Sequence, residues 1–317
     1  MPAGTMDRKF QDALRSGDAN EVAKIPKADL HNHSLMGCRR SEMEKFYGAS
    51  IRPFVYQGNG IHDVNRWIAG EYAPVFRKPG AFAAALRATF QQAKSDGVTV
   101  LEMSIDAGLG PLLGITAGTV AETFRAIHGE VAPEMDFRPE IGFPRHLPVR
   151  QAMVLLAPYL ELGYFRSIDM YDDELSQPAR NFREVFRAAR TAGMKCKAHA
   201  GEFGTAESVR ETVEVLELDA VQHGIAAAAS PEVMKWLAGQ GIPLNICPTS
   251  NVTLQLVPSL MAHPIRVLFD HGVKVTVNSD DVILFDRSVS DEFLGLYRAG
   301  LFSAEELDVI RLNGLSA

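Results

Sequence analysis

The sequence has few cysteines, and none of them forms a recognisable metal or redox motif. Cys38, Cys196 and Cys247 are far apart in the 317-residue chain and include no CxxC pair. This number and spacing argue against a structural zinc ribbon and against a framework of disulfide bonds. They also exclude a catalytic zinc site in which a PCxxC motif supplies two thiolate ligands.

The chain also lacks long apolar stretches and an excess of positive charge. Residues 1–24 contain no apolar segment typical of a secretion signal, and no run of about 18 apolar residues occurs. The net charge of −7 gives no electrostatic basis for holding a nucleic-acid backbone. We therefore expect a cytoplasmic protein with no membrane and no nucleic-acid polymer as partner. A small-molecule partner, including a single nucleotide or nucleoside, stays open.

Short apolar runs alternate with segments rich in Ala, Arg, Glu and Leu. This alternation predicts βα units and a parallel sheet, and eight such units favour a closed (β/α)8 TIM barrel in a single domain, 1–317. A doubly wound open sheet would carry a glycine-rich phosphate motif after its first strand, where this chain has HNHSLMG. The predicted strands are 28–33, 98–105, 138–143, 165–170, 194–200, 219–224, 242–247 and 273–278.

Two segments lie outside the regular repeat. Residues 6–16 have the pattern of an amphipathic helix ahead of the barrel. A long helical insertion of about 38–80 separates the first two strands, and its Gly58-Asn59-Gly60 turn and aromatic residues suit a lid over the barrel mouth. A structural cap that does not touch substrate is the alternative.

Histidines stand at the ends of two predicted strands. His31 and His33 are two residues apart, which places both side chains on one face of a strand. His199 and Glu202 end the fifth strand, and Gly201 between them permits a sharp exit from it. Active sites of such barrels lie at the C-terminal ends of the strands. Taken singly, an HxH pair can arise by chance and His199 can be a hydrogen-bonded core residue.

Two further strand ends carry similar residues. His223 ends the sixth strand, and the adjacent carboxylates of Asp280 and Asp281 follow the eighth. Such carboxylates are costly to bury unless a cation compensates them, although a helix-capping aspartate with a solvated neighbour is the simpler alternative. Four strand ends thus deliver His or Asp to one face. Three nitrogens and one carboxylate oxygen suit zinc and leave a position for water.

In these motifs the chain resembles the adenosine deaminase family, from about residue 26 to 314. The resemblance implies one zinc ion (Zn2+) per chain, held by His31, His33, His199 and Asp280. The matching segments are PKADLHNH (26–33), HAGE (199–202), QHGI (222–225), CPTSNVTL (247–254), HPIRVLFDHGV (263–273) and NSDD (278–281).

The resemblance also implies catalytic roles. Glu202 matches the proton donor, His223 the histidine that orients water, and Asp281 the carboxylate that binds a purine ring nitrogen. Gly201 is expected beside the substrate. We expect His223 and Asp280 to orient the water and accept its proton, and metal-bound hydroxide to attack the carbon that bears an amino group. Glu202 must then be protonated at the start, and ammonia is the product.

The chain departs from the family at positions that concern the substrate. Leu35 stands where the family has an aspartate that contacts ribose, and an apolar side chain accepts no hydrogen bond from a sugar. Asp172, preceded by Tyr171, replaces a glycine whose backbone meets the purine, and Val282 replaces a proline. These changes favour an amino-purine or related amino-heterocycle with an altered or missing sugar; a free base, a modified nucleoside and a nucleotide derivative all stay open.

Further features have two interpretations each. Arg39, Arg40, Arg52 and Arg145 could meet a phosphate or carboxylate, or be ordinary surface residues. The chain stops at Ala317, where family members continue with a final helix, so we expect a truncated C-terminus. Two functional alternatives also stay open. One is a different metal-dependent amidohydrolase, of which two-metal members often use a lysine on the fourth strand that is missing here. The other is a non-catalytic binding relative.

Overall fold

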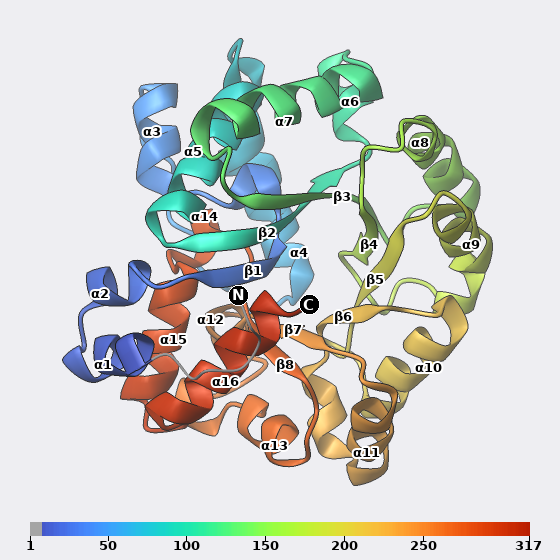
Figure 1. Cartoon of the computed structure of the whole chain (residues 1–317). Helices are drawn as coiled ribbons and strands as arrows, with labels where there is room; N and C mark the ends of the chain where they lie inside the picture. Colours follow the sequence, from blue (N-terminus) through green and yellow to red (C-terminus); the bar gives the residue numbers. More distant parts are fainter. Residues whose placement is uncertain (1–7) are drawn as a thin grey trace.

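Eight parallel strands form the centre of the molecule. The computed structural model describes residues 8–317. Each strand pairs with its neighbour in chain order, and a bridge between Asn32 and Asp280 joins the last strand segment to the first (Figure 1). The predicted (β/α)8 barrel and all eight predicted strands are confirmed. The strands are β1 (Lys27–Asn32), β2 (Val98–Asp106), β3 (Asp136–Pro144), β4 (Ser167–Tyr171), β5 (Lys195–Ala200), β6 (Ala220–His223), β7 (Leu244–Ile246) and β8 (Val275–Val277).

Helices surround this barrel and bury its apolar outer face, as βα crossovers require. Figure 1 shows them as an outer ring that follows the strands in sequence order. The ring and its connections comprise α5 (Ala81–Ser95), α6 (Leu109–Leu113), α7 (Ala117–Val131), α8 (Val149–Glu161), α9 (Arg183–Thr191), α10 (Ala206–Leu216), α11 (Pro231–Gln240), α12 (Pro248–Thr253), α13 (Ile265–Asp270), α14 (Val282–Phe285), α15 (Val289–Arg298) and α16 (Ala304–Leu315).

The two ends of the described chain pack near each other. The helix predicted over 6–16 is present as α1 (Arg8–Ser16), followed by α2 (Ala19–Ala23); residues 6 and 7 lie outside the described residues. The last helix, α16, packs against β1 and β8, where Arg311 donates to the Pro26 carbonyl over 2.7 Å. In the described part of the chain, we find no helix with the length and apolar character needed to cross a membrane.

The predicted insertion folds into a small helical layer on the C-terminal side of the barrel. It contains α3 (Arg40–Tyr47), α4 (Ile61–Trp67), a π turn (Ile68–Tyr72) and a 3-10 turn (Ala73–Arg77). A separate apolar cluster, which includes Met43 and Trp67, joins it to Leu254, Ile283 and other residues that follow β7 and β8. The insertion thus lies at the end of the barrel where the sequence places the chemistry.

A buried ion cluster lies within the barrel. The ammonium of Lys197 contacts the carboxylates of Glu102 and Glu140, with 2.8 Å to Glu140 Oε2, and all three side chains are buried. Arg138 reaches Glu102 from the barrel's edge over 3.2 Å. Because removal of one partner leaves uncompensated buried charge, this cluster makes the barrel sensitive to substitution.

We expect Lys197→Met to lower the free energy of unfolding by about 3–5 kcal/mol, because two buried carboxylates lose their main cation. Denaturant unfolding monitored by circular dichroism measures this loss. The matched control is Lys195→Met on the same strand, where the side chain is exposed and a change within about 0.5 kcal/mol is expected. Equal effects of the two substitutions would contradict a role for the ion cluster in stability.

Candidate active site

The C-terminal ends of four strands bring the predicted site residues together. The rings of His31 and His199 lie 4.7 Å apart between centroids, and those of His31 and His33 lie 5.2 Å apart. The register of β1 is irregular after Asp29 and the strand ends at Asn32, so His33 lies one residue beyond the strand. The predicted strand 28–33 includes both histidines, whereas only His31 lies on β1; their side chains nevertheless converge as expected.

The four predicted metal ligands form a compact donor set. His31 Nε2 lies 3.1 Å from His199 Nε2, and Asp280 Oδ1 lies 3.5 Å from His33 Nε2 and 3.9 Å from His31 Nε2. Ligand atoms about 2.0 Å from a tetrahedral zinc ion lie about 3.3 Å from one another. The spacing of these donors therefore suits such an ion.

Hydrogen bonds on the far side of two imidazoles orient them toward this common point. His31 Nδ1 lies 3.2 Å from the carbonyl oxygen of Asn245, and His199 Nδ1 lies 3.3 Å from Asp169 Oδ1. Both partners only accept, so each Nδ1 carries the proton and each Nε2 presents a lone pair. Two unprotonated nitrogens 3.1 Å apart repel each other unless a cation or a proton lies between them. The residues present thus fit a metal ion.

The electrostatics of this donor set agree with this conclusion. Burial lowers the pKa of His199, but the carboxylate of Asp169, with smaller contributions from Glu202 and Asp280, outweighs burial and raises that pKa to about 9. Without a metal, a proton on His199 would occupy the place that the geometry offers to a cation. Asp169 therefore stabilises a positive charge at this imidazole, whether that charge is a proton or a metal ion.

Glu202 is held on a turn directly after β5. Gly201 has φ +68°, and a Cβ at this position would lie 2.3 Å from Val209 Cγ2, so only glycine fits. The buried carboxylate of Glu174 accepts the backbone N–H groups of Gly201, Glu202 and Phe203 over 2.8–3.0 Å. The turn that carries Glu202 is thereby fixed from the loop after β4.

The side chain of Glu202 is buried and faces His223. Its Oε1 lies 3.5 Å from His223 Nε2. Burial raises the pKa of Glu202 to about 8; His199 opposes this rise and the Asp280 carboxylate adds to it. A carboxyl group in this environment keeps its proton at neutral pH, as the acid predicted here must.

His223, Asp280 and Asp281 are the remaining predicted catalytic and substrate-binding residues, and they lie beside Glu202 and the metal-ligand set. His223 Nε2 lies 3.8 Å from Asp280 Oδ2. Asp281 Oδ1 is buried without a hydrogen-bond partner among the described residues, so it is available to a substrate group. Burial, reinforced by Asp280, raises the pKa of Asp281 well above its ordinary range. His223 and Asp280 also have left-handed backbones, with φ +62° and +60°. Strained conformations of this kind concentrate at functional sites.

Asp172 bridges the insertion to the barrel loops. Its Oδ1 accepts a hydrogen bond from Asn65 Nδ2 over 2.8 Å, and His146 Nδ1 donates to its Oδ2 over 2.5 Å. Both carboxylate oxygens of Asp172 are thus already engaged within the protein.

The other two residues that depart from the family near the substrate lie close by. Tyr171, which precedes Asp172, donates a hydrogen bond to Asp106, and its ring lies 5.5 Å from that of His33. Leu35 lies half-buried in a 3-10 turn between the two apolar clusters.

The four arginines considered as anion contacts all have partners within the chain. Arg39 pairs with Asp286 and Asp291, Arg40 with Glu44, and Arg52 with Glu71. Arg145 is buried and donates to the Gln177 carbonyl over 2.8 Å. These contacts favour the ordinary structural interpretation of the four side chains.

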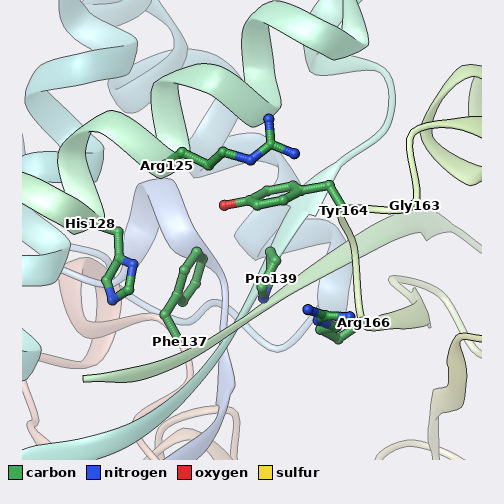
Figure 2. Close-up of a pocket in the computed structure, with 7 residues that line it drawn as sticks. All are labelled: Arg125, His128, Phe137, Pro139, Gly163, Tyr164 and Arg166. Atoms are coloured by element: carbon green, nitrogen blue, oxygen red, sulfur yellow. The ribbon is translucent and has the colours of Figure 1, made fainter. Parts of the chain in front are cut away.

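A surface cavity of about 360 Å³ lies elsewhere, between α7, the start of β3 and the loop before β4. Figure 2 shows the Arg125 guanidinium over the ring of Tyr164, 4.3 Å from its centroid, with Arg166 on the other side of the cavity. It lies toward the N-terminal ends of the strands and is lined by none of the predicted site residues. The chemistry therefore does not belong to this cavity.

Four residues that support this site are not among the predicted site residues. Asp169 lies on β4 and Glu174 in the loop that follows it, and both belong to the segment 169–174, for which the sequence suggested only substrate contacts. Asn251 lies in the CPTSN motif, and His263 opens the HP motif; neither received a role. Asp169 and Glu174 could have been found as acidic residues near the end of a strand. Asn251 and His263 could have been found because each lies in a motif that the chain shares with the family.

Comparison with known proteins identifies the family. The family model described as adenosine deaminase matches residues 67–317. A putative adenosine/adenine deaminase of Treponema pallidum is 31% identical over 290 residues, which cover 90% of this chain and 97% of that protein. An adenine deaminase of Rhodopseudomonas palustris is 34% identical over 316 residues and covers 93% of this chain and 90% of its own.

Solved structures agree in fold. An adenine deaminase from Arthrobacter aurescens superimposes with a TM-score of 0.83 at 24% identity, over 92% of this chain and 93% of its own. An amidohydrolase from Burkholderia ambifaria with bound Zn has a TM-score of 0.81 at 23% identity, over 100% of this chain and 90% of its own. With the extent of the family match and the conserved layout of the barrel, the chain belongs to the adenosine deaminase family and is a metal-dependent deaminase.

Proposed function

We propose that this chain is a mononuclear zinc-dependent hydrolase that deaminates an amino-purine. One water molecule is consumed, its oxygen replaces the exocyclic amino group, and one ammonia molecule is released. The observation that carries the proposal is the convergence of His31, His33, His199 and Asp280 beside the buried carboxyl group of Glu202. A Lewis-acid site and a protonated acid in contact are the two requirements of this reaction.

Each residue has a defined part in this scheme. A zinc ion, when bound, supplies Lewis-acid activation of a water molecule. Asp280 accepts a proton from the water through a carboxylate oxygen and returns it to the amino group, which leaves as ammonia when its bond to the ring carbon breaks. Glu202 donates its proton to the ring nitrogen beside the reacting carbon, which draws electrons away from that carbon. Asp281 holds a second ring nitrogen through Oδ1, the atom that has no partner within the described protein.

A single metal ion per chain is favoured over a pair. The two-metal alternative often bridges its ions with a carboxylated lysine on the fourth strand, and β4 has the sequence SIDMY. Lys197 on β5 is committed to the buried carboxylates of Glu102 and Glu140. The relative from Burkholderia ambifaria, described with bound Zn, supports the choice of metal.

Within the amino-purines, we propose that the free base is preferred to the nucleoside. Leu35 accepts no hydrogen bond from a sugar hydroxyl, and both oxygens of Asp172 hold side chains of the protein. A ribose at this edge would lose its hydrogen bonds to water without replacement, which costs affinity. The relatives described as adenine deaminases support the same choice.

The test compares kcat/KM for ammonia release from adenine, adenosine, AMP and cytosine by the zinc-loaded chain. We expect the highest value for adenine and none for cytosine. A higher value for adenosine or AMP would contradict the proposed preference for the free base, but it would still support the proposed deaminase activity. No release from any of the four compounds, with metal bound and the fold intact, would contradict the proposed function and favour the non-catalytic alternative.

A further inference from the structure

A line of buried hydrogen bonds leads from the protein backbone to His223. The backbone N–H of Ile265 donates to His263 Nδ1 over 3.1 Å. His263 Nε2 lies 3.2 Å from Asn251 Oδ1, and Asn251 Nδ2 lies 3.2 Å from His223 Nδ1. The side chains of His263, Asn251 and His223 are all buried. The line joins the start of α13, α12 after β7, and the end of β6.

The direction of each hydrogen bond follows from its backbone end. A backbone N–H can only donate, so His263 Nδ1 accepts and the proton of this imidazole is on Nε2. His263 Nε2 therefore donates to Asn251, which must present its oxygen. Burial lowers the pKa of His263 to about 3, in keeping with a neutral ring.

The same logic extends to the active site. Once Asn251 presents its oxygen to His263, its NH2 group faces His223 and donates to Nδ1. An imidazole that accepts at Nδ1 carries its single proton on Nε2. That Nε2–H faces Glu202 Oε1 at 3.5 Å and Asp280 Oδ2 at 3.8 Å. The carboxyl group of Glu202, which keeps its proton, and the carboxylate of Asp280 thus face His223 on the reaction side.

We propose that Asn251 and His263 are positioning residues that hold His223 in the Nε2–H tautomer. His223 is then a hydrogen-bond donor to the oxygen that is added to the ring, and it takes no proton from the water. This assignment differs from the expectation that His223 and Asp280 share proton acceptance, because it leaves Asp280 as the acceptor. The catalytic consequence rests on the proposed function, whereas the tautomer itself does not.

The tautomer can be read directly by 15N NMR of the zinc-loaded full chain with labelled histidine. In the wild type we expect His223 Nδ1 to resonate as an unprotonated nitrogen and Nε2 as a protonated one. Asn251→Asp replaces the donor by an acceptor of nearly equal size, so the proton should move to Nδ1. Because a hydrogen-bond donor to the added oxygen is lost, ammonia release from the best purine substrate should fall about 10²- to 10³-fold, with zinc content unchanged.

A pair of variants at His263 guards against misfolding as the explanation. Gln at 263 can accept from Ile265 and donate to Asn251, so His263→Gln should keep the Nε2–H tautomer and most activity. His263→Leu removes both bonds and should mix the tautomers and lower kcat more than it changes KM. Thermal unfolding of each variant reports the fold.

Two results would overturn the proposal. One is a wild-type His223 with its proton on Nδ1. The other is an Asn251→Asp variant in which the tautomer moves and kcat does not. Since the spectrum needs no substrate, an inactive wild type with the Nε2–H tautomer would contradict the proposed function and still support the tautomer assignment.

Discussion

Glu202→Gln should yield a folded chain that binds one zinc ion and deaminates about 10²- to 10⁴-fold more slowly than the wild type. Glutamine has no acidic proton to give to the ring nitrogen, although its size and hydrogen bonds are similar. Burial raises the pKa of Glu202 to about 8, so the wild-type side chain carries this proton at neutral pH. Steady-state ammonia release and metal analysis of the same preparation measure the two quantities.

The matched control for this substitution is Glu207→Gln. Glu207 lies exposed in the first turn of α10, a few residues after the active-site turn. Its replacement should change neither metal content nor rate. A Glu202→Gln variant that binds zinc and turns over near the wild-type rate would show that another group supplies the proton.

His199→Ala should lose both metal and activity. Without this imidazole the remaining donors are His31, His33 and the Asp280 carboxylate, and Asp169 loses the group that it orients. Metal content by mass spectrometry, measured after dialysis against a weak chelator, should fall well below one equivalent per chain. Asp169→Asn should weaken metal binding less, by about 10- to 100-fold, because Asp169 only orients the ligand.

His271→Ala is the control, because His271 is exposed, lies outside the active site, and its Nδ1 bonds the backbone carbonyl of Val267. It should keep a full equivalent of zinc. Stoichiometric zinc in His199→Ala would remove His199 from the ligand set. In that case the buried cluster of His31, His223 and Cys247 would be the next candidate.

The sequence was sufficient for the barrel because each strand is a short apolar run between segments of helical pattern. The C-terminal ends of the predicted strands also indicated where the active site lies, since parallel strands place their last residues on one face of the barrel. His31 and His33 show the limit of the pattern. Their spacing predicts a shared face, but the irregular end of β1, which places His33 outside the strand, depends on the pairing with β2.

The supporting residues could not be predicted because each acts through a partner distant in sequence. Glu174 contributes by accepting backbone N–H groups of the Gly201 turn, and nothing in either segment indicates that they meet. The same holds for Asp172. The sequence shows that a carboxylate replaces glycine, but only the folded insertion shows that Asn65 and His146 take both of its oxygens.

The most direct test of the account is the stoichiometry of products from adenine incubated with the purified, zinc-loaded chain. We expect one ammonia and one 6-oxopurine per adenine consumed, with the rate lost on chelation and restored by one equivalent of zinc. A chain that holds zinc in the folded state and converts no amino-purine would contradict the proposed reaction, and would leave the barrel with its metal site to another function.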